Sequence, residues 1–386
     1  MTEWKTYRLG DIIDKVIDNR GKSAPTSDEE YSPIIEINSI GDRNPNYDVV
    51  RKWVSKDTYD TWFRSGHPMI GDILIPTVGT IGIVSMMREN KGCIAQNIVA
   101  LRTNEKAHNL YLYYFLKSGY VKHELLNLNI GGVQPSIKVP HLLNLEISLP
   151  SLEEQRKIAG ILGAIDDKIE NNRRINDNLE KQAQALFDKI FFDDNDAERN
   201  PLSDYADINP TRTLHQGVAA RYIEMANLPT RGSFPSDWSY KSYGGGCKFA
   251  NGDTIMARIT PCLENGKTAY IDFLEEQEVA FGSTEYIVIS SKSGYCPALF
   301  YFLARNKEFV DYAVGHMNGS SGRQRVSGAD IANFPMPHIT LEESNKFAEI
   351  AMPIMDVIRN NSLENRHLAT LRDTLLPKLM NGEIKL

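Results

Sequence analysis

The sequence predicts an α+β protein in which two mixed α/β domains are separated by two long antiparallel coiled-coil helices, forming a pseudo-twofold internal repeat. Three observations support this prediction. The chain repeats itself at a shift of about 189 residues, each copy ends in a helical pattern with an apolar seam, and strand-like and helix-like segments precede each seam. A chain of 386 residues can bury more than one core.

The internal repeat is visible in matched motifs. Residues 151–154 (Ser-Leu-Glu-Glu) match residues 340–343 (Thr-Leu-Glu-Glu), and Gly71-Asp72 matches Gly252-Asp253. Two copies of a unit this large are too few for a solenoid and imply a pseudo-twofold molecule. The resulting division is a first globular domain, a long helix, a linker, a second globular domain and a second helical region, over residues 1–150, 151–192, 193–200, 201–338 and 339–386.

Each copy is predicted to end in a long helix. The motifs at 151–154 and 340–343 are capping boxes, in which a hydroxyl and a carboxylate satisfy exposed backbone donors. Residues spaced alternately four and three apart then form a seam typical of coiled coils. Pro353 should kink or interrupt the second helix, because proline lacks an amide donor. The seam comprises Ile158, Leu162, Ile165, Ile169, Asn172, Asn176, Leu179, Ala183, Leu186 and Ile190, and in the second copy Phe347, Ala351, Ile354, Ile358, Asn361, Asn365, Leu368, Arg372, Leu375 and Leu379.

The two helices are predicted to pack against each other. A helix of about 40 residues is about 60 Å long and needs more than one small domain to cover its stripe. A pseudo-twofold relation makes the pair antiparallel and brings residues 172 and 361 near its middle. We therefore expect Asn172 to approach Asn361, so that Asn172, Asn176, Asn361 and Asn365 fix the register of the helices. The alternative is that these asparagines face solvent or a partner protein.

The globular domains show mixed patterns. Residues 94–101 and 285–289 are predicted strands, and residues 71–76 form a turn that leads into a strand ending at proline. Residues 110–117 and 298–305 are predicted short helices whose aromatic side chains belong to the core. This combination indicates α+β domains.

Charge and cysteine usage limit the class of protein. The net charge is −7, but residues 1–150 carry 17 basic and 17 acidic side chains, whereas residues 151–200 carry 8 and 12. Overall charge therefore permits DNA binding without supporting it. The cysteines are scattered, and the sequence has neither a signal-peptide pattern nor an apolar run of bilayer length. These features predict a soluble, cytoplasmic protein with no membrane partner.

The sequence carries no recognised catalytic or metal-binding motif. The Gly266-Lys267-Thr268 stretch lacks the upstream glycine of a phosphate-binding loop, because that position is Pro261. No histidines have metal-ligand spacing, and no serine lies in a nucleophile elbow. Because a carboxylate site leaves no signature, an enzyme with an unrecognised site stays open at this point.

Several stretches resemble the specificity subunits of Type I restriction-modification systems. The resemblance is strongest over 145–191, with GGVQPSIKVPHLLNLEI at 131–147 and GDILIPTVGTIG at 71–82. The second copy departs from the pattern at residues 321–326 and 342–344. Together with the repeat, the resemblance covers nearly the whole chain.

The resemblance implies a non-catalytic DNA-recognition subunit. Its two domains would be target recognition domains, each reading one half of a split sequence in double-stranded DNA, with the helices setting the spacing. Two copies of a methyltransferase subunit would grip the helices, and a restriction subunit would join them. S-adenosylmethionine, Mg²⁺ and ATP are expected only on these partner subunits, with no cofactor or metal on this chain. The alternative is a scaffold or decoy of the same architecture that binds the methyltransferase without reading DNA.

Candidate DNA-binding residues come from the loops that carry the resemblance. A glycine-rich loop offers backbone amides together with polar side chains that suit phosphate or groove contacts. The competing interpretation is a structural turn that docks the domain onto its helix. The bases that are read cannot be assigned, because recognition segments differ between the domains. The candidates are Gln134, Ser136, Lys138, Thr77 and Thr80 in the first copy, and Arg258, Arg323, Gln324 and Arg325 in the second.

Overall fold

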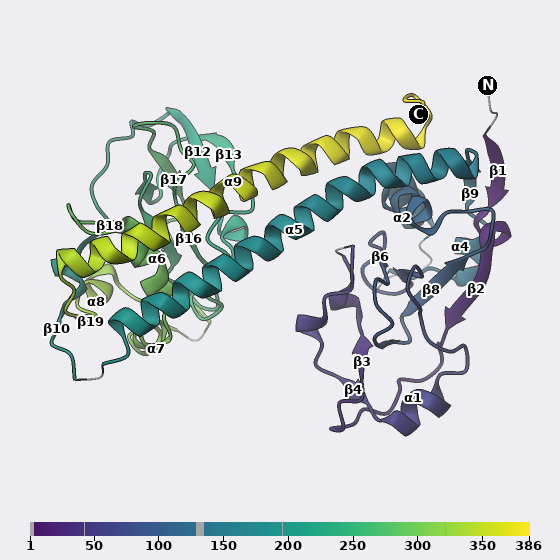
Figure 1. Ribbon diagram of the computed structural model, residues 1–386, viewed down its shortest axis with the longest axis horizontal. Coiled ribbons are helices and arrows are strands. Elements are labelled where there is room, and N and C mark those ends of the chain that lie inside the picture. The colour runs from purple at the N-terminus through teal and green to yellow at the C-terminus, as the bar shows by residue number, and fades with distance from the viewer. Residues whose placement is uncertain (1–3, 42, 129–134, 195, 321) are drawn as a thin grey trace. The chain divides into compact units, whose positions relative to one another are not determined.

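A computed structural model describes residues 4–41, 43–128, 135–194, 196–320 and 322–386 (Figure 1). The chain divides into two compact units. Unit 1 comprises Met1–Asp167 with Leu368–Leu386, and unit 2 comprises Lys168–His367. Each unit therefore contains one globular domain together with a segment of both long helices.

The long helices are α5 (Leu152–Phe191) and α9 (Leu341–Met380). In unit 1, Ile158 and Leu162 of α5 share a core with Leu376 and Leu379 of α9. In unit 2, Phe187 near the end of α5 packs edge-on against Phe347 near the start of α9, with ring centroids 5.8 Å apart. The helices thus run antiparallel within each unit, as the seam predicted.

Unit 1 is built around the sheet β2-β8-β5-β6, in which every neighbouring pair is antiparallel. A second sheet, β4-β3-β7, includes the parallel pair β3–β7, and β1 pairs with β9. The bounds are β1 Lys5–Arg8, β2 Ile13–Asp18, β3 Ser32–Ile35, β4 Trp53–Val54, α1 Lys56–Trp62, β5 Ile73–Pro76, β6 Ser85–Met86, β7 Cys93–Ile94, β8 Ile98–Thr103, α2 Asn109–Lys117, α3 Gly119–Asn127, α4 Val139–Leu143 and β9 Glu146–Leu149.

Unit 2 repeats this plan. Its sheet β11-β18-β15-β16 has the order of β2-β8-β5-β6, β13-β12-β17-β14 corresponds to β4-β3-β7, and β10 pairs with β19. The pair β12–β17 is parallel, like β3–β7. The bounds are β10 Arg199–Pro201, β11 Ala206–Ile208, β12 Ala219–Ile223, β13 Ser239–Ser242, β14 Lys248–Phe249, β15 Thr254–Ala257, β16 Thr268–Tyr270, β17 Ala280–Gly282, β18 Tyr286–Ser291, α6 Pro297–Arg305, α7 Lys307–Gly315, α8 Gly328–Ala332 and β19 Pro335–Pro337. The α+β fold with a pseudo-twofold repeat is confirmed.

The two units differ in one segment, which lies between β4 and β5 in unit 1 and between β13 and β15 in unit 2. Unit 1 has α1 between β4 and β5, whereas the described residues of unit 2 have β14 at the corresponding place. Ser55 caps α1 by accepting a hydrogen bond from the Thr58 amide, and Phe63 anchors the helix end in a small apolar cluster. The repeat therefore conserves the framework, and this segment distinguishes the two domains.

The matched Gly-Asp motifs have a structural role in each domain. Gly71 has a φ of 91° and Gly252 a φ of 88°, which is the left-handed conformation that glycine adopts readily. The following carboxylate is buried and accepts a hydrogen bond from a backbone amide of the same turn, that of Met69 or Ala250. Each carboxylate also pairs with an arginine, Asp72 with Arg102 and Asp253 with Arg212.

The predicted aromatic helices are confirmed as core elements. Residues 111–116 of α2 are all buried, and so are residues 298–304 of α6. The predicted single strand over residues 94–101 is wrong, because a turn at 95–97 separates β7 from β8. The two strands join different sheets, and the polar pair Gln96-Asn97 forms the turn between them.

Two details of the helical seam are also corrected. Ile190 is 41% exposed, while Phe187 and Phe191 are buried in the aromatic core of unit 2. Pro353 does not interrupt α9, which is continuous from Leu341 to Met380. Pro353 is exposed and lacks the amide that would donate to the carbonyl four residues earlier in the helix.

No helix in the described part of the chain combines the length and hydropathy that a membrane span requires. The described residues also contain no cluster of three or more His, Cys, Asp or Glu side chains placed to hold a metal ion. The four cysteines are free thiols.

Candidate nucleic-acid interface

Two loops of unit 1 are joined by a short backbone clasp. One loop follows β5 and the other leads into α4. The Gly79 amide donates to the Pro135 carbonyl, and the Ile137 amide donates to the Thr77 carbonyl, each over 2.8 Å. An isolated antiparallel bridge joins Val78 and Ser136. The structure therefore brings together the two segments that the sequence singled out separately.

The same clasp occurs in unit 2. The Thr260 amide donates to the Gln324 carbonyl, and the Val326 amide donates to the Arg258 carbonyl, each over 3.0 Å. Ile259 and Arg325 form the equivalent bridge. Equivalent positions of the two clasps thus carry different side chains on the same backbone frame.

The candidate residues of the first clasp divide into buried and exposed positions. Thr77 is buried, and its hydroxyl donates to the Asn97 carbonyl over 3.2 Å. Thr80 and Lys138 are exposed, and Ser136 is half-buried. Gln134 lies outside the described residues. The exposed hydroxyl and ammonium groups are available to a ligand, whereas Thr77 supports the loop.

The clasp loop of unit 1 also docks onto the long helix. Ile137 and Val139 are buried in the core that contains Ile158 and Leu162 of α5, while Lys138 between them is exposed. The two interpretations of this loop, a DNA contact and a structural turn that docks the domain onto its helix, therefore apply to alternate residues. Its apolar positions hold the domain against α5, and its polar position faces outward.

In unit 2, Arg325 is committed to internal contacts. Its guanidinium forms an ion pair with Glu285, with Nη2 2.7 Å from the carboxylate, and its Nη1 donates to the Arg323 carbonyl over 2.9 Å. The hydrogen bond from Arg325 holds the pKa of Glu285 below its usual value. Arg323 is exposed, whereas Gln324 and Arg258 are half-buried. Among the candidates in this clasp, the Arg323 side chain is therefore the most accessible.

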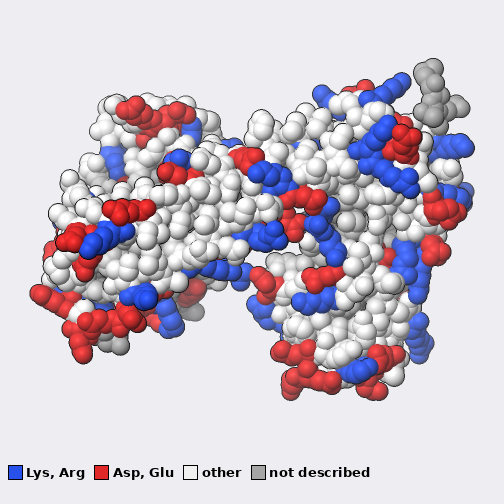
Figure 2. All heavy atoms as spheres, in the orientation of Figure 1, with Lys and Arg blue, Asp and Glu red and all other residues white. Residues whose placement is uncertain are grey.

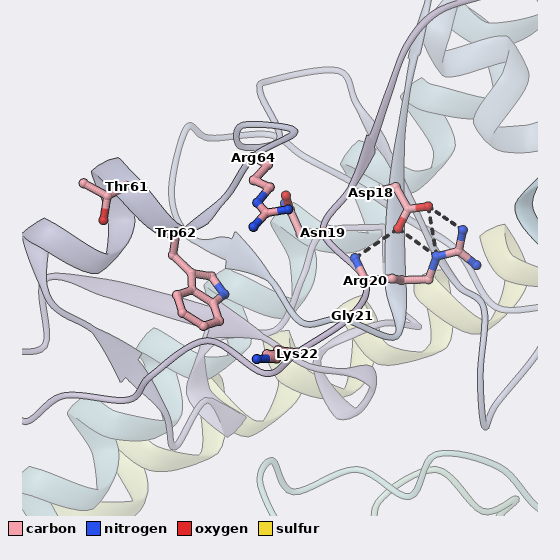
Figure 3. Close-up of a pocket in the computed structure, with 8 residues that line it drawn as sticks. All are labelled: Asp18, Asn19, Arg20, Gly21, Lys22, Thr61, Trp62 and Arg64. Atoms are coloured by element: carbon pink, nitrogen blue, oxygen red, sulfur yellow. Dashed lines mark hydrogen bonds and ion pairs between the residues drawn. The ribbon is translucent and has the colours of Figure 1, made fainter.

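A pocket of about 540 Å³ lies in unit 1 beside α1 (Figure 3). Its lining comes from the turn after β2 and from the end of α1, and it combines basic side chains with an exposed indole. Trp62 is 38% exposed. The lining residues are Asp18, Asn19, Arg20, Gly21, Lys22, Thr61, Trp62 and Arg64.

Hydrogen bonds fix the two walls of this pocket to each other. Asn19 donates from its amide group to the Gly66 carbonyl over 3.1 Å and accepts from the Ser65 amide over 3.0 Å. The Ser65 hydroxyl donates to the Asp18 carbonyl over 2.7 Å. These bonds hold the turn after β2 against the residues that follow α1.

Sequence reasoning missed this pocket. Its residues belong to no repeat motif, and none of them lies in a stretch that resembles the family. A signal was nonetheless present: the segment 18–22, Asp-Asn-Arg-Gly-Lys, places two cations around a glycine immediately after a strand. Its approach to Trp62 depends on the tertiary fold, so the sequence alone did not link the two segments.

The asparagines of the seam lie inside the helix pair of unit 2. The Asn172 side-chain amide donates to Asn365 over 3.0 Å and to Glu364 over 2.7 Å. The Asn361 side chain donates to Asn176 over 2.8 Å. The expected partner of Asn172 was Asn361, but its hydrogen bonds go one helical turn further along α9. Because 172 corresponds to 361 and 176 to 365, the two pairs are equivalent under the internal repeat.

Charged side chains are distributed unevenly over the face shown in Figure 2. Acidic side chains gather at the end of unit 2 where α5 leads into β10, in keeping with Asp193, Asp194, Asp196 and Glu198 at this point of the chain. On unit 1, basic and acidic groups are interspersed on this face. The net negative charge therefore does not cover the chain uniformly.

Comparisons with known proteins agree with this geometry. A family profile described as "Type I restriction modification DNA specificity domain" matches residues 1–181. The MjaIX Type I restriction enzyme specificity subunit of Methanocaldococcus jannaschii is 27% identical over 358 residues, covering 82% of this chain and 78% of the relative.

A second relative extends over almost the whole chain. A putative Type I restriction enzyme MjaX specificity subunit of the same organism is 23% identical, covering 99% of this chain and 94% of the relative. The crystal structure of a Type I restriction-modification S subunit from M. genitalium superimposes with a TM-score of 0.64 at 16% identity, covering 98% of this chain and 96% of that one. Residues 1–181 thus match the profile of Type I restriction-modification DNA specificity domains, and the chain is similar to Type I restriction enzyme specificity subunits over most of its length.

Proposed function

We propose that this chain directs a methyltransferase and a restriction subunit to a bipartite target in double-stranded DNA. Each domain reads one half-site, and the helices α5 and α9 set the spacing between the half-sites. The observation that carries the proposal is the duplicated clasp, in which the same backbone frame presents different side chains in the two domains. A repeated framework with diverged loops is what two related readers of different half-sites require.

The exposed polar residues of the clasps are the proposed backbone contacts. Thr80 and Lys138 in the first domain and Arg323 in the second have the donor groups that phosphate oxygens accept. Ser136, Gln324 and Arg258 are half-buried beside them and complete the candidate set. Thr77 and Arg325 act within the protein in this proposal, because their polar groups already bind Asn97 and Glu285.

The proposed methyltransferase-binding surface is the outer face of the helices. Ile350 and Val357 of α9 are 49% and 43% exposed and lie seven residues apart, so they share one side of the helix. An apolar strip on a helix already paired through its inner seam suits further helices, which supports docking of two methyltransferase copies.

The chain performs no chemistry in this proposal. S-adenosylmethionine, Mg²⁺ and ATP bind to the partner subunits, which modify, translocate and cleave DNA in the cytoplasm. In the proposal, this chain binds the DNA target and positions the partner subunits on it. Its half-site contacts decide which adenines reach the methyltransferase.

The direct test is to co-purify the chain with its methyltransferase and map adenine methylation in DNA exposed to the complex. We expect methylation at one split motif. Replacing residues 201–338 by the matching segment of another specificity subunit should change only one half of that motif. A stable complex that methylates no defined motif would instead identify a scaffold or decoy, and the absence of any complex would refute the proposal.

The docking surface has its own test. The Ile350→Glu/Val357→Glu variant should retain its thermal unfolding midpoint but lose co-purification with the methyltransferase, because charges would be buried in the new interface. Glu349→Lys, at an exposed neighbouring position, is the matched control for a change of surface charge. Unaltered complex formation by the double variant would place the docking surface elsewhere.

A further inference from the structure

Asp18 and Arg20 form an ion pair beside the pocket of unit 1, and this pair uses only some of the donor groups of the arginine. Arg20 Nε lies 2.8 and 2.9 Å from the two Asp18 oxygens, and Nη2 lies 2.6 Å from one of them. The Arg20 amide also donates to the carboxylate over 3.2 Å. One edge of the guanidinium is thereby held, while Nη1 donates to no residue that the structure describes.

The held arginine remains accessible. Its side chain is 41% exposed, and Figure 3 shows the guanidinium with its hydrogen bonds to Asp18 on one edge only. The contrast with Arg325 is informative. That arginine is held by Glu285 in the same way, but its Nη1 donates to a backbone carbonyl and is occupied. Arg20 therefore has a fixed orientation and an Nη1 that donates to no described residue, whereas Nη1 of Arg325, whose side chain is 38% exposed, donates to the Arg323 carbonyl.

The surroundings of Arg20 favour a polyanionic ligand. Lys22 and Arg64 are exposed, line the same pocket and have no ion pair with any described residue. The exposed Trp62 indole adds an apolar wall. Two unpaired cations and an aromatic face line the pocket beside the turn that carries this oriented guanidinium (Figure 3), and together they match the chemistry of a DNA strand, which offers phosphates, sugars and base edges.

The position of the pocket in the fold also indicates a recognition role. It is lined by the end of α1, and α1 is the element for which the described part of unit 2 has no helical counterpart. Residues that read different half-sites must differ between the two domains. The pocket lies where the backbone structures of the domains diverge, whereas the clasps share one backbone frame and differ only in their side chains.

The geometry points to Arg20 as a base-reading residue of the first domain, with guanine as its target. Its Nη1 and Nη2 groups donate a fork to N7 and O6 of a guanine in the major groove, while Asp18 holds the guanidinium in place. Lys22 and Arg64 contact neighbouring phosphates, and Trp62 packs against the sugar of the same strand. This inference rests on the proposed function and adds to it the identity of one recognised base.

The test uses the assembled complex with the methyltransferase. For Arg20→Ala we expect one G·C position in one half-site to become degenerate, with the other half-site unchanged. Discrimination at that position should fall roughly tenfold to a hundredfold, the usual contribution of a bidentate arginine–guanine contact. Arg20→Lys keeps the charge but removes the fork, so it should relax the same position.

Companion variants separate the roles of the neighbouring residues. Asp18→Asn should relax the same position by a smaller factor, because the arginine is then less firmly oriented. Lys22→Ala and Arg64→Ala should leave the motif intact, weaken binding to all sequences, and each lower the salt slope of the binding constant by about 0.9. Arg51→Ala, an exposed arginine elsewhere in this domain, is the control and should alter neither the motif nor the slope.

The outcomes distinguish this inference from the proposed function. If the unaltered complex methylates no split motif, the proposed function fails. If it methylates such a motif and Arg20→Ala and Arg20→Lys leave every position as specific as before, Arg20 is not a base reader. If both variants weaken all sequences equally, Arg20 is a phosphate contact, and the assignment of a guanine is overturned.

Discussion

Asn172 of α5 and Asn365 of α9 form a side-chain hydrogen bond of 3.0 Å inside the helix pair of unit 2. The internal repeat reproduces this contact as the bond between Asn361 and Asn176. The two asparagine pairs are therefore equivalent under the internal repeat. Polar pairs in an apolar seam favour one register, because a shifted register leaves amide groups buried without partners.

The asparagine pairs are expected to be energetically coupled. Asn172→Leu alone should lower the free energy of unfolding by about 1–2 kcal/mol, because the half-buried Asn365 loses its hydrogen-bond partner. Asn172→Leu/Asn365→Leu should recover most of this loss, since two leucines pack in the seam. A double-mutant cycle measured by chemical denaturation gives the coupling free energy. Asn360→Leu, on the exposed side of α9, is the control, and purely additive effects would contradict a register pair.

A second polar contact between the helices lies in unit 1. Asp166 of α5 accepts hydrogen bonds from Tyr114 over 2.7 Å and from Arg372 over 2.8 Å. The side chains of Asp166 and Arg372 are only 8% and 18% exposed. The repeat places Met355 and Ala183 at the corresponding positions of unit 2, so this ion pair occurs in one copy only.

Loss of one partner should therefore be costly. Arg372→Ala leaves a buried carboxylate without its cation, and we expect a loss of about 3–5 kcal/mol in unfolding free energy. Asp166→Met/Arg372→Ala, which installs the residues of the other copy, should cost less than the single change. Thermal and chemical unfolding of both variants tests this. A double variant as unstable as the sum of its single changes would show that the charges are not coupled.

The sequence predicted the elements whose signals are local or repeated. The capping boxes, the seam and the matched motifs led to α5 and α9, and the aromatic runs led to α2 and α6. Periodicity does not indicate which residue of the other helix faces a given position, and so the partner of Asn172 was displaced by one turn. The break between Ile94 and Ile98 was missed because both sides of it are equally apolar.

The candidate site was predictable only in part. The clasp segments have recognisable motifs, and the structure joins them as Val78 with Ser136 and Ile259 with Arg325. The burial of Thr77 and the capture of Arg325 by Glu285 depend on tertiary contacts that leave no mark in the sequence. Arg20 and Trp62 are 42 positions apart in the chain, so their common pocket arises only on folding.

Pro353 should weaken the helix it occupies. A proline inside a helix removes one hydrogen bond and costs up to about 3 kcal/mol relative to alanine, although part of this is offset in the unfolded chain. Pro353→Ala should thus raise the free energy of unfolding by about 1–2 kcal/mol. Pro377→Ala, closer to the end of α9, is the comparison and should give a smaller gain. A lower melting temperature for Pro353→Ala would mean that the proline fits a bend that the chain requires.

The stability of unit 2 should depend on the protonation of Asp272. Burial, only partly offset by Arg359, raises the pKa of this carboxyl to about 7, and its Oδ1 is buried without a hydrogen-bond partner. Because the folded pKa exceeds that of the unfolded chain, the native state holds the extra proton between pH 4 and 7, roughly. The stabilisation of the native state by this proton is fully present below about pH 4 and is lost as the pH rises through about 7.

Asp272→Asn should remove that dependence. An amide cannot ionise, so the variant should lose less stability than the unaltered chain between pH 5 and 8, by about 2 kcal/mol. Unfolding curves at several pH values give the slope of the unfolding free energy against pH for the variant and for the unaltered chain. The difference between the two slopes isolates Asp272 from other titrating groups. Asp237→Asn, at an exposed carboxylate of the same unit that pairs with Arg366, is the control. Parallel pH profiles for Asp272→Asn and the unaltered chain would show that Asp272 stays ionised throughout this range.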